Sequence, residues 1–412
     1  MEEIRKEIKE KVILVAVATE DPVQTEKSLD ELEELVKTAG AEVVARVIQL
    51  REAPHPGTYI GKGKIEEVQA FLYGTDATGI VCDDELSPAQ ISNLEQALDT
   101  KIMDRTLIIL DIFAKRAFTR EGKIQVELAQ LKYRASKLTG KGTSLSRLGG
   151  GIGTRGPGEK KLEMDRRLIR TRISHLKAEL RDVIKHRQVQ RKQRQRNHMP
   201  VVCIVGYTNA GKSTLLNYYT NAGVLEEDQL FATLDPTTKS VELESGQTIL
   251  MTDTVGFIQK LPHHLVDAFK STLEEAKYSD LILHVVDASN PQKEQQMETV
   301  YNTLNQLGAN ESSVITAFNK IDLLKDEEIL KDPRAEAVVK ISGKTGEGTA
   351  KLLQTIEEML QKKKLYLEKT YGYDEAGKIQ IIRNYGQLLK EEYTEEGIYV
   401  QAYIPKEILG SI

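Results

Sequence analysis

The stretch Gly206–Ser213 constrains the fold of this chain more than any other part of its sequence. It reads GYTNAGKS, follows the apolar run VVCIV and precedes the helix-like run STLLNYY. This order matches the pattern G-x-x-x-x-G-K-[ST] together with the strand–loop–helix context that the pattern requires. Such a loop turns backbone N–H groups toward phosphate oxygens at the start of a helix. The sequence therefore predicts a phosphate-binding loop on an α/β sheet.

Three further motifs follow this loop, each at the end of an apolar, strand-like run. DTVG begins at Asp253, the last residue of TILMTD; NKID covers Asn319–Asp322 after SVITAF; and ISGKTGEG begins at Ile341 after AVVK. The carboxylate of Asp322 can accept hydrogen bonds from both N1–H and the 2-amino group of guanine, a donor pair that adenine lacks. The four motifs in this order predict a site for GTP rather than ATP.

The residue types in these motifs suggest a role for each side chain. Lys212 would reach the outer phosphates, the Ser213 hydroxyl would ligate Mg²⁺, and Asp253 would hold the ion through a water molecule. The Gly256 N–H would sense the γ-phosphate. The candidate nucleotide-binding residues in these motifs are Gly206, Tyr207, Thr208, Asn209, Ala210, Gly211, Lys212, Ser213, Thr214, Asp253, Thr254, Val255, Gly256, Asn319, Lys320, Ile321, Asp322, Ser342, Gly343 and Lys344.

The N-terminal part of the chain alternates strand-like and helix-like segments. The strand-like runs VILVAVA, EVVARVIQL, GIVCDD and LIILDIF are separated by helical periods near 24–37, 64–72 and 88–98. Alternation of this kind favours a small α/β domain with a parallel sheet.

Two apolar stripes with helical spacing come next. A loop that is rich in glycine, residues 139–161, separates them, so we expect two helices that pack antiparallel as a hairpin. Arg166 interrupts the second stripe at a core position. The stripes are Ile124, Leu128, Leu131, Ala135 and Leu138, then Leu162, Ile169, Ile173, Leu176, Leu180 and Val183.

The glycine-rich loop contains GIGTRG at Gly151–Gly156, which matches G-x-G-x-x-G. A dinucleotide site is excluded because no buried strand precedes the glycines and no strand with an acidic residue follows them. Two interpretations stay open: a flexible connector, or a cationic tip that contacts RNA phosphates. For the second, the candidate RNA contacts are Arg147, Arg155, Lys160 and Lys161.

These patterns predict an α/β multidomain chain with four parts. We expect an N-terminal α/β domain at 1–113, the helical hairpin at 114–198, a P-loop Ras-like G domain at 199–362 and a small α+β C-terminal domain at 363–412. The last part reads as strand, helix and two alternating strands joined by EEG.

Composition bears on the class of partner and on the cellular compartment. With 40% hydrophobic residues, 29% charged residues and a net charge of −5, the chain has no global charge bias toward nucleic acid. Both cysteines, Cys82 and Cys203, lie in apolar runs, which indicates buried strand thiols in a reducing compartment. No apolar run is long enough to span a bilayer, so we expect no membrane insertion, although peripheral membrane attachment stays open. We expect a cytoplasmic protein and a monomer.

The segment 199–362 resembles the translation-factor-like GTPases, and the remainder narrows the resemblance to the HflX family of ribosome-associated GTPases, in the Obg-HflX-like branch. The resemblance covers essentially the whole chain. The family usually has ETQ after GPG, where this chain has EKK. The matching stretches are TYIGKGK from Thr58, ELSPAQ from Glu85, DRTLIILDIFAKRA from Asp104, EGKIQVELAQL from Glu121, GGGIGTRGPGE from Gly149 and FATLDPTT from Phe231.

This resemblance implies a second set of nucleotide-binding residues, switch I, at Phe231, Ala232, Thr233, Leu234 and Asp235. It makes Thr233 the hydroxyl that joins Mg²⁺ when the γ-phosphate is present, although Thr237 and Thr238 are chemically equivalent candidates. Lys212, Thr233 and Gly256 then form the expected catalytic set. Phe257 stands where Ras-like proteins place the glutamine that orients the attacking water, so slow intrinsic hydrolysis is expected.

The resemblance also implies partners: GTP and GDP, and the large ribosomal subunit with its rRNA. The expected function is a ribosome-stimulated GTPase switch that dissociates or rescues ribosomes under stress. Two alternatives from other classes remain. One is a nucleotide-driven, helicase-like RNA remodeller whose N-terminal domain binds a second nucleotide, although that region has no phosphate-loop motif. The other is a passive rRNA-binding scaffold with a structural G domain.

Overall fold

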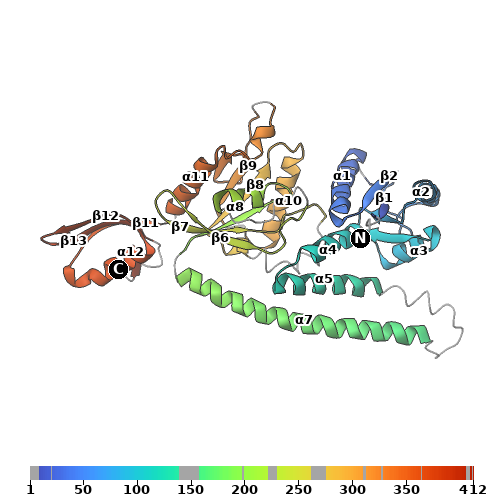
Figure 1. The fold of residues 1–412 in the computed structure, drawn as a ribbon, viewed down its shortest axis with the longest axis horizontal. Helices are drawn as coiled ribbons and strands as arrows, with labels where there is room; N and C mark the ends of the chain where they lie inside the picture. The colour runs from blue at the N-terminus through green and yellow to red at the C-terminus, as the bar shows by residue number, and fades with distance from the viewer. Residues whose placement is uncertain are drawn as a thin grey trace, which may run out of the picture. The chain divides into compact units, whose positions relative to one another are not determined.

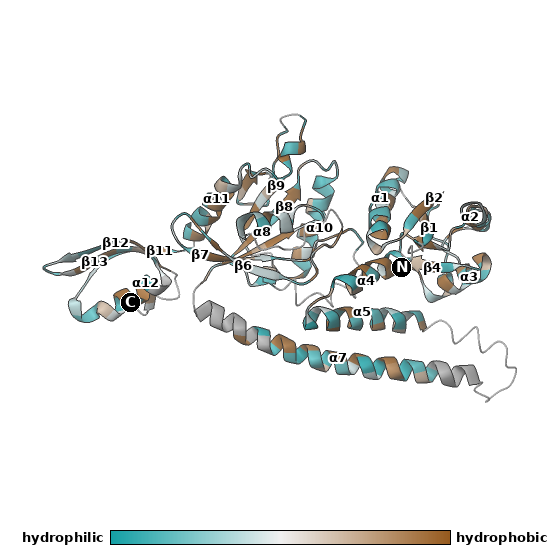
Figure 2. Ribbon diagram, in the orientation of Figure 1, coloured by the Kyte–Doolittle hydropathy of each residue, from teal (hydrophilic) through white to brown (hydrophobic). Residues whose placement is uncertain are grey.

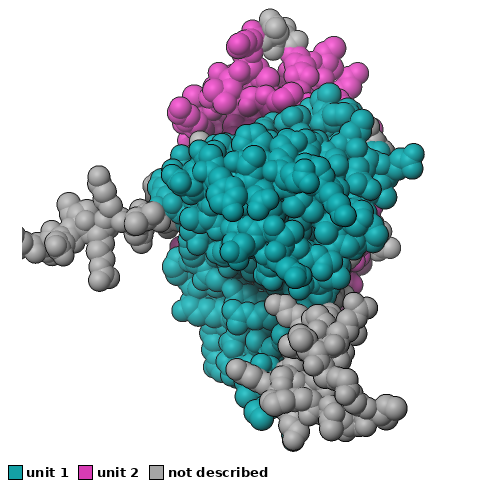
Figure 3. Space-filling view, turned by 90° about the vertical axis from the view of Figure 1, so that its right-hand side faces the viewer, with its two compact units in different colours: residues 1–183, 227–235, 258–270 teal, residues 184–226, 236–257, 271–412 magenta. Residues whose placement is uncertain are grey.

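The computed structural model describes residues 9–19, 21–138, 157–196, 199–220, 230–260, 275–309, 312–325, 328–362, 364–404, 409–410 and 412. The chain divides into two compact units, each assembled from separate stretches of sequence (Figure 3). The first unit comprises 1–183, 227–235 and 258–270, and the second comprises 184–226, 236–257 and 271–412. The four-part division of the sequence stays a prediction. Within the described ranges, none of the helices has both the length and the apolar character to cross a membrane.

The first unit contains a parallel sheet with the strand order β2-β1-β3-β4 (Figure 1). Helices α2 and α3 pack on one face of this sheet through a core that includes Ile13, Val15, Val68 and Leu94. The elements are β1 (Lys11–Ala18), α1 (Pro22–Ala39), β2 (Glu42–Leu50), α2 (Lys62–Thr75), β3 (Gly79–Cys82), α3 (Pro88–Leu98), β4 (Lys101–Asp104) and α4 (Arg105–Arg116).

One expected strand is wrong. LIILDIF, residues 107–113, lies inside the helix α4, and the fourth strand of the sheet is KIMD, Lys101–Asp104. A short apolar run does not separate a strand from a buried helix by periodicity. The deciding feature is Asp104, whose carboxylate accepts a hydrogen bond from Leu107 N (3.0 Å) and so caps the N-terminus of α4.

The two striped segments form the antiparallel hairpin that the sequence predicts: α5 (Arg120–Leu138) and α7 (Pro157–Arg196). Figure 2 shows apolar residues recurring between polar ones along both helices. Arg172 pairs with Glu127 at 2.7 Å, and Arg166 Nη2 donates to the carbonyl of Leu138 at 2.7 Å, near the C-terminus of α5. Arg166 therefore satisfies a helix-end carbonyl instead of filling the seam. The seam packs Ile124, Leu128 and Leu176 with Leu131, Ile173, Leu180 and Val183.

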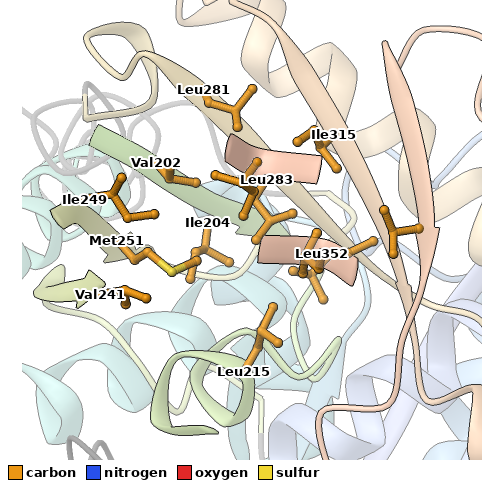
Figure 4. Close-up of a cluster of buried hydrophobic side chains, with 14 of the residues drawn as sticks. Val202, Ile204, Leu215, Val241, Ile249, Met251, Leu281, Leu283, Ile315 and Leu352 are labelled. Atoms are coloured by element: carbon orange, nitrogen blue, oxygen red, sulfur yellow. The ribbon is translucent and has the colours of Figure 1, made fainter. Parts of the chain in front are cut away.

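The second unit contains a six-stranded sheet with the order β10-β9-β8-β5-β7-β6, parallel except for the pair β6–β7. Its core gathers aliphatic side chains such as Ile204, Leu215, Leu283 and Leu352 (Figure 4). The elements are β5 (Val201–Gly206), α8 (Lys212–Thr220), β6 (Thr237–Glu242), β7 (Thr248–Asp253), β8 (Leu281–Asp287), α10 (Lys293–Gln306), β9 (Val314–Asn319), η1 (Ile321–Leu323), β10 (Ala337–Lys340) and α11 (Thr349–Lys362).

The C-terminal part of the second unit is a three-stranded antiparallel sheet, β11-β13-β12, with one helix packed on it. This matches the expected strand, helix and strand pair. The elements are β11 (Leu365–Tyr371), η2 (Tyr373–Glu375), α12 (Ala376–Tyr385), β12 (Gln387–Thr394) and β13 (Gly397–Ile404).

Both cysteines lie in strands, as expected. Cys82 ends β3 and Cys203 lies in β5, and both are fully buried free thiols. Burial raises the pKa of each thiol, which keeps both protonated and unreactive.

Candidate functional site

The loop between β5 and α8 folds as the P-loop pattern requires. Gly206 and Gly211 have positive φ angles of 156° and 90°. A Cβ on Gly206 would come within 2.2 Å of the Val285 carbonyl oxygen, and one on Gly211 would come within 2.2 Å of Asn319 Nδ2. Only glycine allows these approaches, so the motif glycines bring neighbouring loops against the phosphate loop.

Lys212 and Ser213 begin α8 at the carboxyl end of β5. The Lys212 side chain is only 6% exposed, and its Nζ donates to the Tyr207 carbonyl oxygen at 2.8 Å. Burial lowers the pKa of Lys212 to about 8, although the charge of Asp253 acts in the opposite direction. Ser213 Oγ donates to Asp253 Oδ2 at 2.7 Å, and Asp253 ends β7, which pairs with β5. The predicted phosphate and metal residues are therefore neighbours.

The DTVG segment packs directly against the P-loop. Phe257 N donates to the Gly206 carbonyl at 3.1 Å, and Thr208 N donates to the Phe257 carbonyl at 2.8 Å. A Cβ on Gly256 would lie 2.9 Å from Thr208 Cα and 3.0 Å from Lys212 Nζ. The glycine thus lets the backbone come close to the P-loop lysine. The Phe257 ring is 2% exposed and offers no hydrogen-bonding group.

Asn319, at the end of β9, connects the P-loop with the segment that begins at Ile341. Its Nδ2 donates to the Ala210 carbonyl at 2.8 Å, and its Oδ1 accepts from Gly343 N at 2.8 Å. Ser342 Oγ donates to Asp322 Oδ1 at 2.6 Å. This contact orients the exposed Asp322 carboxylate, which is the group expected to recognise guanine.

The second unit therefore brings the predicted residues of the four motifs, 206–214, 253–256, 319–322 and 342–344, to the carboxyl ends of its parallel strands. Ligands of open α/β sheets bind at this edge. One contact was not predicted: Lys320 pairs with Asp287 at 2.8 Å. The only sequence signal for Asp287 is an acid directly after the apolar run of β8.

The switch I residues that the resemblance implies, Phe231–Asp235, belong to the first unit. The rings of Phe231 and Phe113 pack edge to face with centroids 4.6 Å apart. The alternative hydroxyls Thr237 and Thr238 begin β6 in the second unit, where Thr238 Oγ1 lies 2.9 Å from Thr252 Oγ1. This hydrogen bond engages the Thr238 hydroxyl within the sheet, and the choice of Thr233 over Thr237 stays a prediction.

The four candidate RNA contacts lie just before or within the N-terminal end of α7 in the sequence. Arg147 and Arg155 lie outside the described residues. Lys160 and Lys161 lie in the first turns of α7, and their side chains lie outside the described part of the chain. All four stay predictions.

Comparison with known proteins matches three family models along the chain. "GTP-binding GTPase N-terminal" matches residues 26–114, "GTP-binding GTPase Middle Region" matches 116–194, and "50S ribosome-binding GTPase" matches 201–320. Among solved structures, a GTP-binding protein from Sulfolobus solfataricus in complex with GDP is similar, with 24% identity, a TM-score of 0.45 and coverage of 86% of this chain and 99% of that one.

Curated relatives are similar over nearly the full chain. The GTPase HflX of Lacrimispora saccharolytica is 67% identical over 99% of this chain and 96% of its own length. The GTPase HflX of Caldanaerobacter subterraneus is 49% identical, over 99% of this chain and 94% of its own length. The GTPase HflX of Escherichia coli is 46% identical, over 81% of this chain and 79% of its own length. This similarity, together with the four GTPase motifs at one sheet edge, shows that the chain belongs to the HflX family of GTPases.

Proposed function

We propose that this GTPase is a GTP-dependent switch that binds the large ribosomal subunit and dissociates or rescues ribosomes under stress. The main support for a GTP-dependent switch is the contact of the DTVG backbone with the P-loop, where Gly256 lies next to Lys212. A γ-phosphate bound by Lys212 would meet this backbone directly. The ribosomal partner is supported by the match of residues 201–320 to a 50S ribosome-binding GTPase model.

The second unit supplies the nucleotide-binding groups. Backbone N–H groups of the P-loop and the Lys212 ammonium would hold the phosphates, and Asp322 would accept the guanine N–H groups. Asn319 fixes the distance between these two subsites through its bonds to Ala210 and Gly343.

A magnesium ion fits the donors that are present. Ser213 Oγ and Asp253 Oδ2 lie 2.7 Å apart at the start of α8, and hydroxyl and carboxylate oxygens are ligands that Mg²⁺ prefers. Ser213 would bind the ion directly, Asp253 through water, and Thr233 would join when the γ-phosphate is bound. When bound, the ion would neutralise charge on the β- and γ-phosphates.

Hydrolysis needs help from a partner. Phe257 occupies the position after DTVG, and its ring can neither donate nor accept a hydrogen bond. No side chain at this position would orient the attacking water, so intrinsic turnover would be slow and the ribosome would raise it. The candidate rRNA contacts are Arg147, Arg155, Lys160 and Lys161.

The test compares ribosome splitting by the wild type and by Lys212→Ala. The proposal expects that GTP-loaded wild type converts intact ribosomes to subunits in a sucrose gradient and that Lys212→Ala does not. Equal splitting by both proteins would instead favour a passive rRNA-binding scaffold. ATP-dependent unwinding of an RNA duplex that persists in Lys212→Ala would favour the RNA remodeller.

A further inference from the structure

The three-stranded sheet of the C-terminal part of the second unit has helix α12 on only one of its faces (Figure 1). The core on that face takes from β11 and β13 the side chains of Leu365, Leu367, Tyr371, Ile398, Val400, Ala402 and Ile404. Because side chains alternate along a strand, the residues between these point to the opposite face. We call that face the tyrosine face, and its members on β11 and β13 include Tyr366, Glu368, Tyr399, Gln401 and Tyr403.

We propose that the tyrosine face is a binding site for a basic peptide segment of a partner protein, with an arginine side chain held between the tyrosine rings and Glu368. This inference goes beyond the proposed GTP switch and does not depend on it. It concerns a surface that none of the nucleotide-binding motifs touches, since it rests on strands that follow the G-domain helix α11 in the chain.

Strand pairing brings the members of the tyrosine face together. Tyr366 lies opposite Tyr403 across the antiparallel pair β11–β13, and Glu368 lies opposite Gln401. The rings of Tyr366 and Tyr403 pack edge to face, with centroids 5.6 Å apart and an angle of 63° between their planes. Directly opposed side chains on one face of a sheet are in contact range. Two aromatic rings and one carboxylate are therefore neighbours on this surface.

Glu368 is the charged centre of the tyrosine face. It accepts hydrogen bonds from the hydroxyl of Tyr399 and, at 3.1 Å, from the hydroxyl of Tyr366. Gln401 Nε2 donates to Tyr399 Oη at 2.7 Å and so completes the network. The hydrogen bond from Tyr399, followed by that from Tyr366, lowers the pKa of Glu368, so the exposed side chain is charged at neutral pH. In the described part of the chain its partners are these neutral groups and no cation.

The tyrosine rings are suited to a cation because the face of an aromatic ring is negative and attracts a positive group within about 6 Å. A tyrosine hydroxyl that donates to a carboxylate is polarised in the direction that increases this attraction. The chain itself supplies one example. Lys390 Nζ, on β12, lies 5.8 Å from the centroid of the Tyr399 ring and also pairs with Glu392 at 2.8 Å. Tyr366 is 50% exposed, and no described lysine or arginine lies over its ring.

Arginine fits this arrangement better than lysine. Its planar guanidinium stacks on an aromatic ring and at the same time donates to a carboxylate, whereas an ammonium is a compact point charge. Because the Tyr366 hydroxyl is hydrogen-bonded to Glu368, one guanidinium over the Tyr366 ring can also reach that carboxylate. Tyrosine and arginine are also both enriched at protein–protein interfaces.

A single-stranded nucleic acid is the other class of partner that stacks on exposed aromatic rings. Its phosphates need cations, and the charges of this face oppose them. The carboxylates of Glu368 and Glu392 stand against the single ammonium of Lys390, which already pairs with Glu392. The balance of charge therefore favours a basic peptide over nucleic acid.

The experiment uses the full chain, loaded with GDP and Mg²⁺, and a fluorescently labelled peptide of alternating arginine and glycine, with anisotropy as the measure of binding. Glu368→Gln keeps the size of the side chain and removes its charge, and it is expected to raise the peptide Kd about 3- to 10-fold. Tyr366→Ala is expected to raise it by a similar factor. Glu395→Gln, in the turn between β12 and β13, makes the same change in net charge away from this face and should stay within about twofold of the wild type.

Two further probes complete the test. The corresponding lysine peptide is expected to bind about threefold more weakly than the arginine peptide. A labelled 12-nucleotide single-stranded RNA should bind the wild type and Tyr366→Ala equally. An unchanged peptide Kd in Glu368→Gln, or an equal loss in Glu395→Gln, would overturn the proposal, and Glu368→Gln keeps the test decisive where Tyr366→Ala fails to fold. RNA binding that Tyr366→Ala weakens would overturn it in favour of a nucleic-acid surface.

Discussion

The side-chain amide of Asn319 donates to the Ala210 carbonyl at 2.8 Å and so connects the base-recognition segment to the phosphate loop. The same side chain accepts from Gly343 N at 2.8 Å. Both partners are backbone groups of loops that bear on the nucleotide. Asn319 therefore acts as a structural bridge within the site, at 3% exposure.

Asn319→Ala is expected to weaken GDP binding about 10- to 100-fold. The change leaves the Ala210 carbonyl and the Gly343 N–H without this partner, and unsatisfied buried groups cost about 1–3 kcal/mol each. Equilibrium titration with GDP measures the loss. Asn302→Ala, on the exposed face of α10, is the matched control and should bind GDP like the wild type. Unchanged affinity in Asn319→Ala would show that the bridge does not shape the site.

Asp322→Asn is expected to exchange guanine preference for xanthine preference. An asparagine amide offers one acceptor and one donor, which suits the N1–H and the 2-oxo group of xanthine rather than the two donors of guanine. Competition titrations with GDP and xanthosine diphosphate measure the ratio. Retained guanine preference would contradict the assignment of Asp322 as the base-recognition group.

Nucleotide affinity should fall as the pH rises above about 8. The pKa of Lys212 is lowered to about 8 by burial, so the free protein loses this charge in mildly alkaline solution. The bound phosphates favour the charged form of Lys212. Above about pH 8 the protein must therefore take up a proton when the nucleotide binds, and this weakens binding by up to about tenfold per pH unit. GDP titrations between pH 7 and pH 9 would show this trend. Lys212→Arg stays charged and should give a flatter profile.

Arg105→Leu is expected to destabilise the first unit by about 3–5 kcal/mol. The guanidinium is 2% exposed and pairs with Asp83 and Glu31, each at 2.6 Å. Its loss leaves the buried Asp83 carboxylate with Lys260 as its cation and deprives the partly buried Glu31 of this ion pair. Chemical denaturation of the full chain measures the change, with Arg170→Leu on the exposed face of α7 as control. A shift no larger than that of the control would show that the buried pair is dispensable.

Local patterns predicted most of the fold and much of the candidate site. The P-loop, DTVG and NKID each combine a fixed residue order with a preceding apolar strand, and these features are local in sequence. The run LIILDIF contains no such motif, and its helical structure depends on the N-cap that Asp104 provides. Lys320 and Asp287 are far apart in sequence, and no motif links them.

The side-chain contacts of Asp235 and Lys260 within the first unit could not be predicted from the sequence. Asp235 accepts from Thr119 N and Lys260 donates to Asp83, and each contact joins segments more than a hundred residues apart. Neither pair has a spacing that a pattern could reveal. Only the fold brings these residues together.

GTP hydrolysis in the presence and absence of purified large ribosomal subunits tests the proposed switch most directly. The proposal predicts slow turnover by the protein alone, because Phe257 cannot orient water, and an increase of about tenfold or more with large subunits. Lys212→Ala should abolish both rates. Equal rates with and without the subunits would contradict a ribosome-stimulated switch.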